Sequence, residues 1–494
     1  MLAHEIMADI PENDIAFIEG DQQTTYGGLK QAIGFCRNRL YAAGIRRGDR
    51  VAICSRNSAN FVFAYLGIVS LGAVVVPINF QLTPREMAYI LQNAEVHHIF
   101  SDKPLDLDEE MTDYAGGLAM FDIASVGIDS GAPEVPVVAD LKESDLAAII
   151  YTSGTTGFPK GAVLSHKNLV SNALQYREIL QLSNKDRSLC VLPLYHCFSW
   201  TCNIMGILSC GASTVILDSF APKEAVEIIS KQQVNVLFVV PSICALLTKF
   251  ATVEVMKQIT LTVIGGTALP EKIAQDYKAK FGLEILEGYG LSECSPVVAV
   301  NPPGRSIAGS IGLPLCETQV KTVRQDGTDA APNEPGELLI KSPSVMQGYW
   351  KLPEETKKAL EGGWLHTGDV AKIDENGYIY IVDRIKDMII SMGENIYPRE
   401  IEELVYHYPG IKEAAVIGIE DRLRGQAGCL YYCVQDGETV ELAALKKYLR
   451  QNLATYKVPR EFRQIDDLPK TSTGKPAKKA LAAMFEMEKD MRSE

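Results

Sequence analysis

Strand-like and helix-like segments alternate through the first hundred residues, and this alternation limits most strongly the folds that the chain can adopt. Residues 50–54, 74–78 and 98–101 are apolar and β-branched, as buried strands are. Residues 60–71 and 83–93 have helical character, and the second of these helices opens with Thr-Pro-Arg-Glu, which resembles a capping box. A β-α-β-α-β order needs crossover connections, which place parallel strands in one sheet. The sequence therefore predicts an α/β fold with doubly wound mixed sheets.

The same alternation continues to about residue 290. Further strands are predicted over 145–151, 234–240 and 261–264, a helix over 241–250, and a helix that begins after the cap Ser165. A short strand over 284–286 is predicted to run into a loop over 287–293. With 494 residues, the chain is long enough for two to four structural units.

The pattern changes after about residue 306, where glycine, proline and short alternating strands dominate. Strands over 336–341 and 377–383 predict a small antiparallel barrel or sheet. A mixed α+β pattern follows, with helices predicted over 399–406 and 442–452 and strands over 414–419 and 429–434. We therefore predict a large N-terminal domain over 1–384 and a small C-terminal domain over 385–494.

Charge and composition exclude several classes of protein. The formal net charge of −14 opposes general binding to nucleic acid. Residues 61–78 carry no charge, but their glycines and proline favour a buried helix and strand over a membrane span. The first residues lack a signal-peptide pattern, and the eleven cysteines form no CxxC pair. Cys429 and Cys433 are the closest pair with the spacing of metal ligands, and we expect them to be buried thiols and not zinc ligands. These features predict a cytoplasmic protein without a transmembrane segment.

A loop rich in glycine and hydroxyl groups follows the strand predicted over 145–151. Residues 152–161 read Thr-Ser-Gly-Thr-Thr-Gly-Phe-Pro-Lys-Gly. Glycines let backbone N–H groups approach an anion, hydroxyls add donors, and Lys160 adds a positive charge. The spacing differs from that of a Walker A loop, since proline precedes the lysine and glycine follows it. The segment predicts a phosphate-binding loop of another kind.

Further motifs follow in a fixed order. They are Leu-Pro-Leu-Tyr-His-Cys-Phe over 192–198, Gly-Gly-Thr-Ala-Leu-Pro over 265–270, Glu-Gly-Tyr-Gly-Leu-Ser-Glu over 287–293, Trp-Leu-His-Thr-Gly-Asp over 364–369, Ser-Met-Gly-Glu over 391–394, and Pro-Lys-Thr-Ser-Thr-Gly-Lys-Pro over 469–476. Together with the phosphate loop they resemble the acyl-CoA synthetases of the adenylate-forming (AMP-binding) superfamily, which also holds luciferases and peptide-synthetase adenylation domains. The resemblance spans most of the chain.

The resemblance implies a site for ATP and AMP. Its residues would be Thr152, Ser153, Gly154, Thr155, Thr156, Gly157, Lys160, Gly266, Thr267, Ala268, Glu287, Gly288, Tyr289, Ser292, Asp369, Arg384 and Lys475. Within this set, Tyr289 would stack on adenine and Asp369 would clamp the ribose. Outside the set, Glu293 would hold Mg²⁺. Lys475 would be the adenylation lysine, with Lys160, Glu293 and His196 as further catalytic residues.

The resemblance also implies a reaction in two steps. A carboxylic acid and ATP would form an acyl-adenylate, and coenzyme A would then take the acyl group. The C-terminal domain would turn at the hinge Lys386 between the steps, which would bring Gly393 and Glu394 to the side of coenzyme A. ATP, Mg²⁺ and coenzyme A are thus the implied cofactor and substrates.

The acid itself is left open by the sequence. No acidic residue occurs between 192 and 207, which disfavours an amino acid. An apolar wall that favours a medium- or long-chain fatty acid is expected from Phe198, Trp200, Cys202, Ile204 and Met205. An aryl acid is the second choice, and an acyl carrier protein could replace coenzyme A. A nucleotide sensor or a luciferase-like oxygenase is less favoured. The oligomeric state cannot be read from the sequence.

Overall fold

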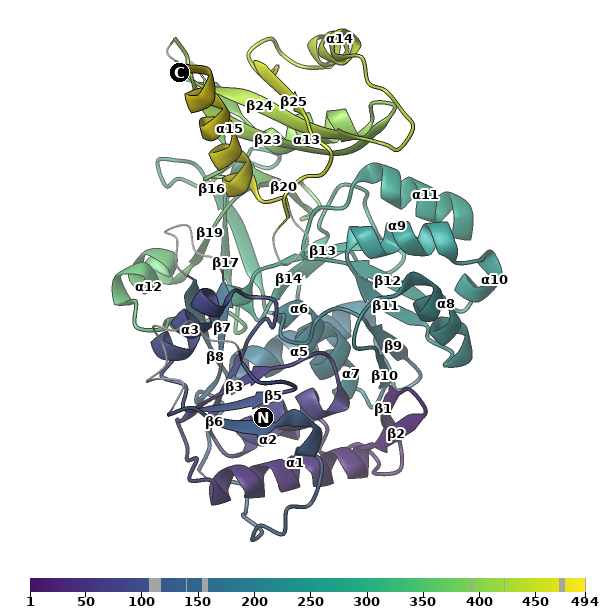
Figure 1. Cartoon of the computed structure of the whole chain (residues 1–494), viewed down its shortest axis with the longest axis vertical. Coiled ribbons are helices and arrows are strands. Elements are labelled where there is room, and N and C mark those ends of the chain that lie inside the picture. Colours follow the sequence, from purple (N-terminus) through teal and green to yellow (C-terminus); the bar gives the residue numbers. More distant parts are fainter. Residues whose placement is uncertain are drawn as a thin grey trace. The chain divides into compact units, whose positions relative to one another are not determined.

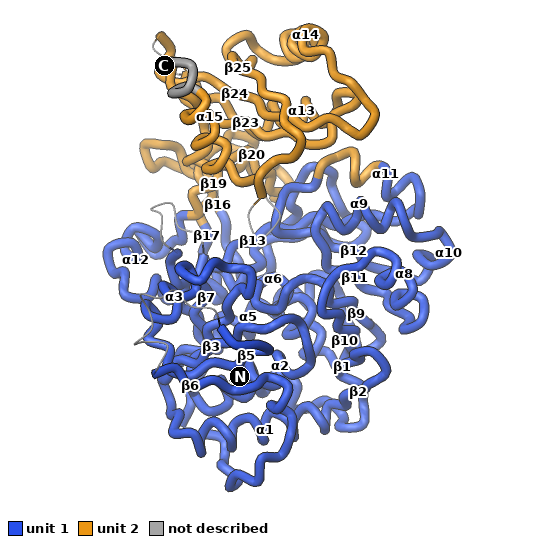
Figure 2. The backbone as a smooth tube through the Cα atoms, in the orientation of Figure 1, with its two compact units in different colours: residues 1–269, 276–320, 340–366 blue, residues 270–275, 321–339, 367–494 orange. Residues whose placement is uncertain are grey.

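The computed structural model describes residues 1–105, 117–138, 140–152, 159–391, 394–421, 423–470 and 476–493. Its contacts divide the chain into two compact units (Figure 2). Unit 1, in blue, comprises residues 1–269, 276–320 and 340–366; unit 2, in orange, comprises 270–275, 321–339 and 367–494.

The first sheet of unit 1 has seven strands in the order β18-β8-β7-β4-β3-β5-β6 (Figure 1). The strands are β3 (Arg50–Cys54), β4 (Val74–Pro77), β5 (His98–Ser101), β6 (Ala119–Asp122), β7 (Leu146–Thr152), β8 (Lys160–Ser165) and β18 (Gly348–Tyr349). The pairs β3–β4, β3–β5, β4–β7 and β5–β6 are parallel, whereas β8 is antiparallel to both of its neighbours. The predicted β-α-β-α-β unit is confirmed.

The second sheet has nine strands in the order β15-β14-β13-β12-β11-β9-β10-β1-β2. They are β1 (Ile15–Glu19), β2 (Gln22–Thr25), β9 (Arg187–Cys190), β10 (Ser213–Ile216), β11 (Val236–Val239), β12 (Leu261–Ile264), β13 (Leu286–Gly290), β14 (Val297–Val300) and β15 (Leu313–Pro314). Its centre is parallel, and antiparallel pairs close both ends. One expectation was wrong: most of 287–293, predicted as a loop, continues β13, because pairing with β14 overrides the low strand propensity of its glycines.

Helices connect these strands. They are α1 (Tyr26–Ala42), α2 (Ala59–Ser70), α3 (Pro84–Asn93), α5 (His166–Leu180), α6 (Cys197–Ser199), α7 (Gly206–Leu208), α8 (Pro222–Lys231), α9 (Pro241–Phe250), α10 (Val253–Met256), α11 (Glu271–Phe281) and α12 (Pro353–Ala359). The predicted capping box of α3 is present, since the Thr83 side chain accepts from the Glu86 N–H and Glu86 accepts from the Thr83 N–H. Ser165 caps α5 in the same way, with Asn168 as its partner.

The uncharged stretch 61–78 forms α2 and β4, and its side chains are buried throughout. Among the described residues, no helix is both long enough and apolar enough to span a membrane. The stretch thus belongs to the core of unit 1, and the buried helix and strand predicted for it are confirmed.

Unit 2 contains most of a four-stranded sheet and a five-stranded sheet. The first has the order β16 (Gln319–Val323), β17 (Gly336–Lys341), β19 (Leu365–Ile373) and β20 (Ile379–Arg384), with β19 and β20 antiparallel. The second contains β21 (Ile389–Ser391), β22 (Glu394–Ile396), β23 (Ile411–Asp421), β24 (Gly425–Val434) and β25 (Glu461–Gln464), accompanied by α13 (Pro398–Tyr406), α14 (Leu442–Asn452) and α15 (Lys478–Ser493). Cys429 and Cys433 are buried in the core that β23 and β24 share.

Candidate functional site

The predicted phosphate loop joins the two strands of a hairpin. In the antiparallel pair β7–β8, Thr152 lies opposite Lys160, and the Thr152 hydroxyl donates to the Lys160 carbonyl at 3.4 Å. Residues 153–158 of the expected loop lie outside the described residues, and they include the predicted site residues Ser153, Gly154, Thr155, Thr156 and Gly157. A strand follows Lys160, whereas a Walker A loop leads directly into a helix. The hairpin therefore confirms that this is a different kind of loop.

Glu293 lies in a short 3-10 helix, η5 (Ser292–Cys294), and two neighbours hold it. The Met346 N–H donates to the Glu293 carbonyl at 2.8 Å, and the Tyr349 hydroxyl donates to Glu293 Oε1 at 2.8 Å. Burial, and then the Glu293 charge, raises the pKa of Tyr349 well above its ordinary range, so the phenol stays protonated as a donor.

The second oxygen of Glu293 has no hydrogen-bond donor within the described part of the chain. The half-buried carboxylate thus presents one oriented, open oxygen, the donor type that Mg²⁺ takes from proteins. Lys160 also contacts Tyr349, with its Nζ 5.3 Å from the centre of the Tyr349 ring. Glu293 and Lys160, predicted from distant motifs, are therefore brought together by Tyr349, and the residues present fit a magnesium ion.

The two loops expected to frame adenine are neighbours in the structure. β12 and β13 pair in parallel with Ile264 opposite Glu287, and the Leu269 N–H donates to Glu287 Oε1 at 3.1 Å. Three predicted residues, Gly266, Thr267 and Ala268, fill the turn between Ile264 and Leu269. Gly266 has a φ of +83°, a conformation that glycine adopts without strain.

Tyr289 and Gly288 lie on β13, opposite Ala299 and Val300 of β14. Tyr289 is half-buried at the end of the strand, so part of its ring remains accessible for stacking. The Ser292 hydroxyl lies 3.3 Å from the Cys197 sulfur. This contact connects the predicted nucleotide loop with the segment predicted to line the acid pocket.

His196 caps the helical segment that follows it. Its Nδ1 accepts a hydrogen bond from the Phe198 N–H at 3.2 Å, and the ring is half-buried. The segment continues as a π-helix over Trp200–Met205. Wide π turns are rare and recur at functional sites. Of the side chains expected to form an apolar wall, Cys202, Ile204 and Met205 are fully buried in the core.

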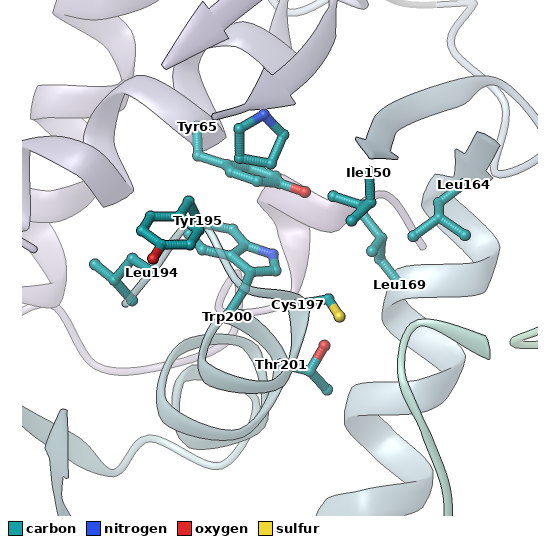
Figure 3. A pocket seen from close by; sticks show the side chains of 10 residues that line it. Tyr65, Ile150, Leu164, Leu169, Leu194, Tyr195, Cys197, Trp200 and Thr201 are labelled. Atoms are coloured by element: carbon teal, nitrogen blue, oxygen red, sulfur yellow. The ribbon is translucent and has the colours of Figure 1, made fainter. Parts of the chain in front are cut away.

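A small cavity lies beside this segment (Figure 3). It holds about 10 Å³, the volume of roughly one water molecule, and Tyr65, Pro77, Ile150, Leu164, Leu169, Leu194, Tyr195, Cys197, Trp200 and Thr201 line it. The Tyr65 and Trp200 rings stack with centres 3.6 Å apart. Neither the Tyr65 hydroxyl nor Trp200 Nε1 has a hydrogen-bond partner among the described residues, although both atoms are buried. Such groups are normally satisfied by a partner or a water.

In unit 2, two residues predicted for the nucleotide site form an ion pair across β19 and β20. Asp369 lies opposite Arg384, and Arg384 Nε is 3.1 Å from Asp369 Oδ1. The Asp369 side chain is buried, whereas half of the Arg384 side chain is exposed. The Asp369 N–H donates to the Thr367 hydroxyl, which fixes the turn before the carboxylate. The role of Asp369 as a ribose clamp stays a prediction.

The residues predicted for the hinge and the coenzyme A side are described in part. Lys386 lies in the turn between β20 and β21, where desolvation and then Arg384 lower its pKa. Glu394 is exposed at the start of β22, opposite Ser391. Gly393 and Lys475 lie outside the described residues.

Two residues that the sequence did not single out belong to this site. Tyr349 lies 56 residues from Glu293, and Tyr65 lies far from Trp200 in the chain. No spacing signal connects residues at such separations. The run Gly-Tyr-Trp before Pro353 is a weak local signal for Tyr349, since glycine within a strand often marks a place where another backbone segment approaches closely.

Comparison with known proteins gives consistent matches over most of the chain. The sequence profile described as "AMP-binding enzyme" matches residues 5–350, and "AMP-binding enzyme C-terminal domain" matches residues 400–475. The chain is 34% identical to a feruloyl-CoA synthase from Amycolatopsis sp (94% of this chain, 95% of the relative). It is 30% identical to a long-chain-fatty-acid–CoA ligase from Escherichia coli O157:H7 (94% and 91%). The structure of an O-succinylbenzoate coenzyme A synthetase from Bacillus subtilis with ATP and magnesium is similar at a TM-score of 0.89, with 28% identity and 97% and 99% coverage.

Proposed function

The chain belongs to the AMP-binding enzyme family and is an AMP-forming acid–CoA ligase, and from this premise we propose that its acid is an aromatic carboxylic acid with a hydrogen-bonding substituent. The observation that carries the proposal is the pair of unpartnered polar atoms, Tyr65 Oη and Trp200 Nε1, on stacked aromatic walls. A hydroxyl or ether on the acid would give these atoms a partner, and an alkyl chain would not. The acid has to displace side chains on entry, because the cavity holds only about 10 Å³.

A fatty acid of medium or long chain is the second candidate. The segment 192–207 has no acidic residue, which leaves no partner there for an ammonium group. The fatty-acid ligase of E. coli supports this candidate, and the feruloyl-CoA synthase supports the aromatic one. The two candidates differ in whether the unpartnered polar atoms matter for recognition.

In the first half-reaction, a carboxylate oxygen attacks the α-phosphorus of ATP and the bond to pyrophosphate breaks. Lys160 and the loop 152–157 would hold the leaving phosphates, and Lys475 would bridge the carboxylate and the α-phosphate. Asp369 and Arg384 would hold the ribose, with the loop 266–268 at the adenine. Mg²⁺, held by Glu293, supplies positive charge beside the phosphates when bound.

In the second half-reaction, the sulfur of coenzyme A bonds to the acyl carbon and the bond to AMP breaks. We propose that residues 385–494 turn at Lys386 between the two steps, which exchanges Lys475 for Gly393 and Glu394. A short turn such as 385–387 can absorb the change in backbone angles that a hinge requires.

A pyrophosphate-exchange panel tests the proposed acid. It compares hydroxylated cinnamic and benzoic acids with their unsubstituted forms, with fatty acids and with amino acids. We expect the hydroxylated aromatic acids to give the highest kcat/KM. Preference for fatty acids would replace the first candidate by the second, and exchange with amino acids alone would refute both.

Tyr65→Phe tests the observation behind the proposal. We expect the variant to lose about tenfold in kcat/KM for the hydroxylated acid and to keep its activity toward the unsubstituted acid, since only one hydrogen bond is removed. Tyr41→Phe is the control, because Tyr41 is exposed on α1. An equal loss for both acids would contradict recognition by Tyr65.

A further inference from the structure

We propose that Tyr349 is a positioning residue for the metal site: its hydroxyl holds one oxygen of Glu293 so that the other oxygen faces the ATP-bound Mg²⁺. The inference rests on the proposed role of Glu293. Tyr349 lies outside the motifs that identified the nucleotide site, and the structure assigns it through its contacts.

The backbone around Tyr349 is anchored on both sides. β18 pairs with β8, with Tyr349 opposite Ala162 and Gly348 opposite Val163. The next residue, Trp350, donates its N–H to the Gly161 carbonyl at 2.8 Å. Tyr349 is thereby fixed to the strand that begins at Lys160, directly after the phosphate loop.

The same segment also holds the backbone of the glutamate. The Met346 N–H donates to the Glu293 carbonyl at 2.8 Å, three residues before Tyr349. The Glu293 backbone and one of its carboxylate oxygens are therefore both held by residues 346–349. A glutamate held at its backbone carbonyl and at one carboxylate oxygen keeps few rotamers, and this lowers the entropy lost when it binds a metal ion.

The ring of Tyr349 contacts the other charged residue of the site. Lys160 Nζ lies 5.3 Å from the ring centre, within the range of a cation–π contact. The hydroxyl thus donates a hydrogen bond to Glu293, and the face of the ring contacts Lys160. The two functions are separable, because Tyr349→Phe removes the hydroxyl and keeps the ring.

Binding of Mn²⁺, measured by electron paramagnetic resonance in the presence of a non-hydrolysable ATP analogue, tests the inference without turnover. We expect Tyr349→Phe to weaken Mn²⁺ binding by about tenfold, the low end of what loss of a hydrogen bond to a metal-binding carboxylate costs. The Mg²⁺ concentration for half-maximal pyrophosphate exchange should rise by a similar factor. Glu293→Gln should weaken Mn²⁺ binding more strongly.

Tyr380→Phe is the matched control, because the Tyr380 hydroxyl donates to a carboxylate, Asp374 Oδ2, at 3.3 Å in unit 2. We expect this control to bind Mn²⁺ as the unchanged protein does. In a double variant with Glu293→Gln, the tyrosine change should add nothing, since its effect acts through the glutamate.

The outcomes separate this inference from the proposed function. If Glu293→Gln weakens Mn²⁺ binding and Tyr349→Phe does not, the positioning role of Tyr349 is overturned and the metal role of Glu293 remains. If neither variant changes Mn²⁺ binding, the metal role of Glu293 fails and the inference fails with it. Equal losses in Tyr349→Phe and Tyr380→Phe would indicate a general structural effect and would also overturn the inference.

Discussion

At the scale of single residues, the reactivity of the cysteines follows from their surroundings. Nine of the eleven cysteines are buried, Cys210 is half-buried and Cys316 is exposed. The Cys316 thiol donates to Glu178 Oε2 at 3.2 Å. Partial burial, and then Glu178, raises the pKa of Cys316 to about 11, because the neighbouring carboxylate disfavours the thiolate. An accessible thiol is therefore held in its unreactive form at neutral pH.

We expect Cys316 to account for the fast phase of labelling when the native enzyme reacts with a thiol-specific disulfide reagent at pH 8. Glu178→Gln should speed this phase several-fold, because the unfavourable charge is removed. Labelling kinetics with peptide mapping measure it, and Cys316→Ser should abolish it. A fast phase that survives in Cys316→Ser would place the reactive thiol elsewhere.

At the scale of an element, α3 shows how much local sequence contributes to local stability. Its capping box is exposed, and Thr83 satisfies the Glu86 N–H while the Glu86 carboxylate accepts from the Thr83 N–H and hydroxyl. Exposed caps of this kind contribute about 1 kcal/mol to a helix. The buried face of α3 packs into the core of the first sheet, and this packing supplies the rest of the stability of the helix.

Thr83→Ala should therefore loosen the start of α3 without unfolding unit 1. We expect hydrogen–deuterium exchange of peptides covering 84–93 to accelerate about fivefold, which corresponds to about 1 kcal/mol of local opening free energy. Thr83→Ser keeps the hydroxyl and is the control. Unchanged exchange in the alanine variant would show that core packing alone fixes the helix.

At the scale of the whole molecule, the half-buried His4 and the buried His166 tie the N-terminal segment to the middle of unit 1. His4 lies in η1 (Ala3–Glu5), and its ring centre is 6.3 Å from that of His166, the first residue of α5. The Ala3 N–H donates to His166 Nδ1 at 3.1 Å. Burial lowers the pKa of both histidines to about 4, opposed by the nearby charges of Glu5 and, at His166, Asp145.

Folding should therefore become less favourable in mild acid. The folded pKa of each histidine, about 4, lies below its unfolded value of 6.5, so the unfolded chain binds more protons between these values. The stability is present above pH 6.5 and is lost as the pH falls toward 4, by at most about 1.4 kcal/mol per pH unit for each histidine.

Thermal melting between pH 7 and pH 5 measures this dependence. We expect the double variant His4→Gln, His166→Asn to show a flatter dependence of Tm on pH, even if its Tm at pH 7 is lower. Other groups titrate in both proteins, so the difference between their slopes is the informative quantity. Equal slopes would mean that the two histidines do not control acid stability.

Most of the secondary-structure elements, and the family, could be predicted from the sequence. Predicted bounds for 241–250, 261–264, 336–341 and 442–452 coincide with those of α9, β12, β17 and α14. The signals are local ones: proline at a helix start, caps, and runs of apolar residues, each complete within about ten residues. The ordered motifs predicted the AMP-binding family in the same local way, and the sequence profiles confirm it.

Which side chains meet depends on the tertiary structure. Strand order brings β18 beside β8, so Tyr349 contacts both Glu293 and Lys160. Packing of α2 against the π-helix stacks Tyr65 on Trp200 and leaves two polar atoms without partners. These contacts join residues far apart in the chain, and no periodicity or spacing encodes them, because they depend on how whole elements pack. The same packing turned the predicted loop 287–293 mostly into strand β13.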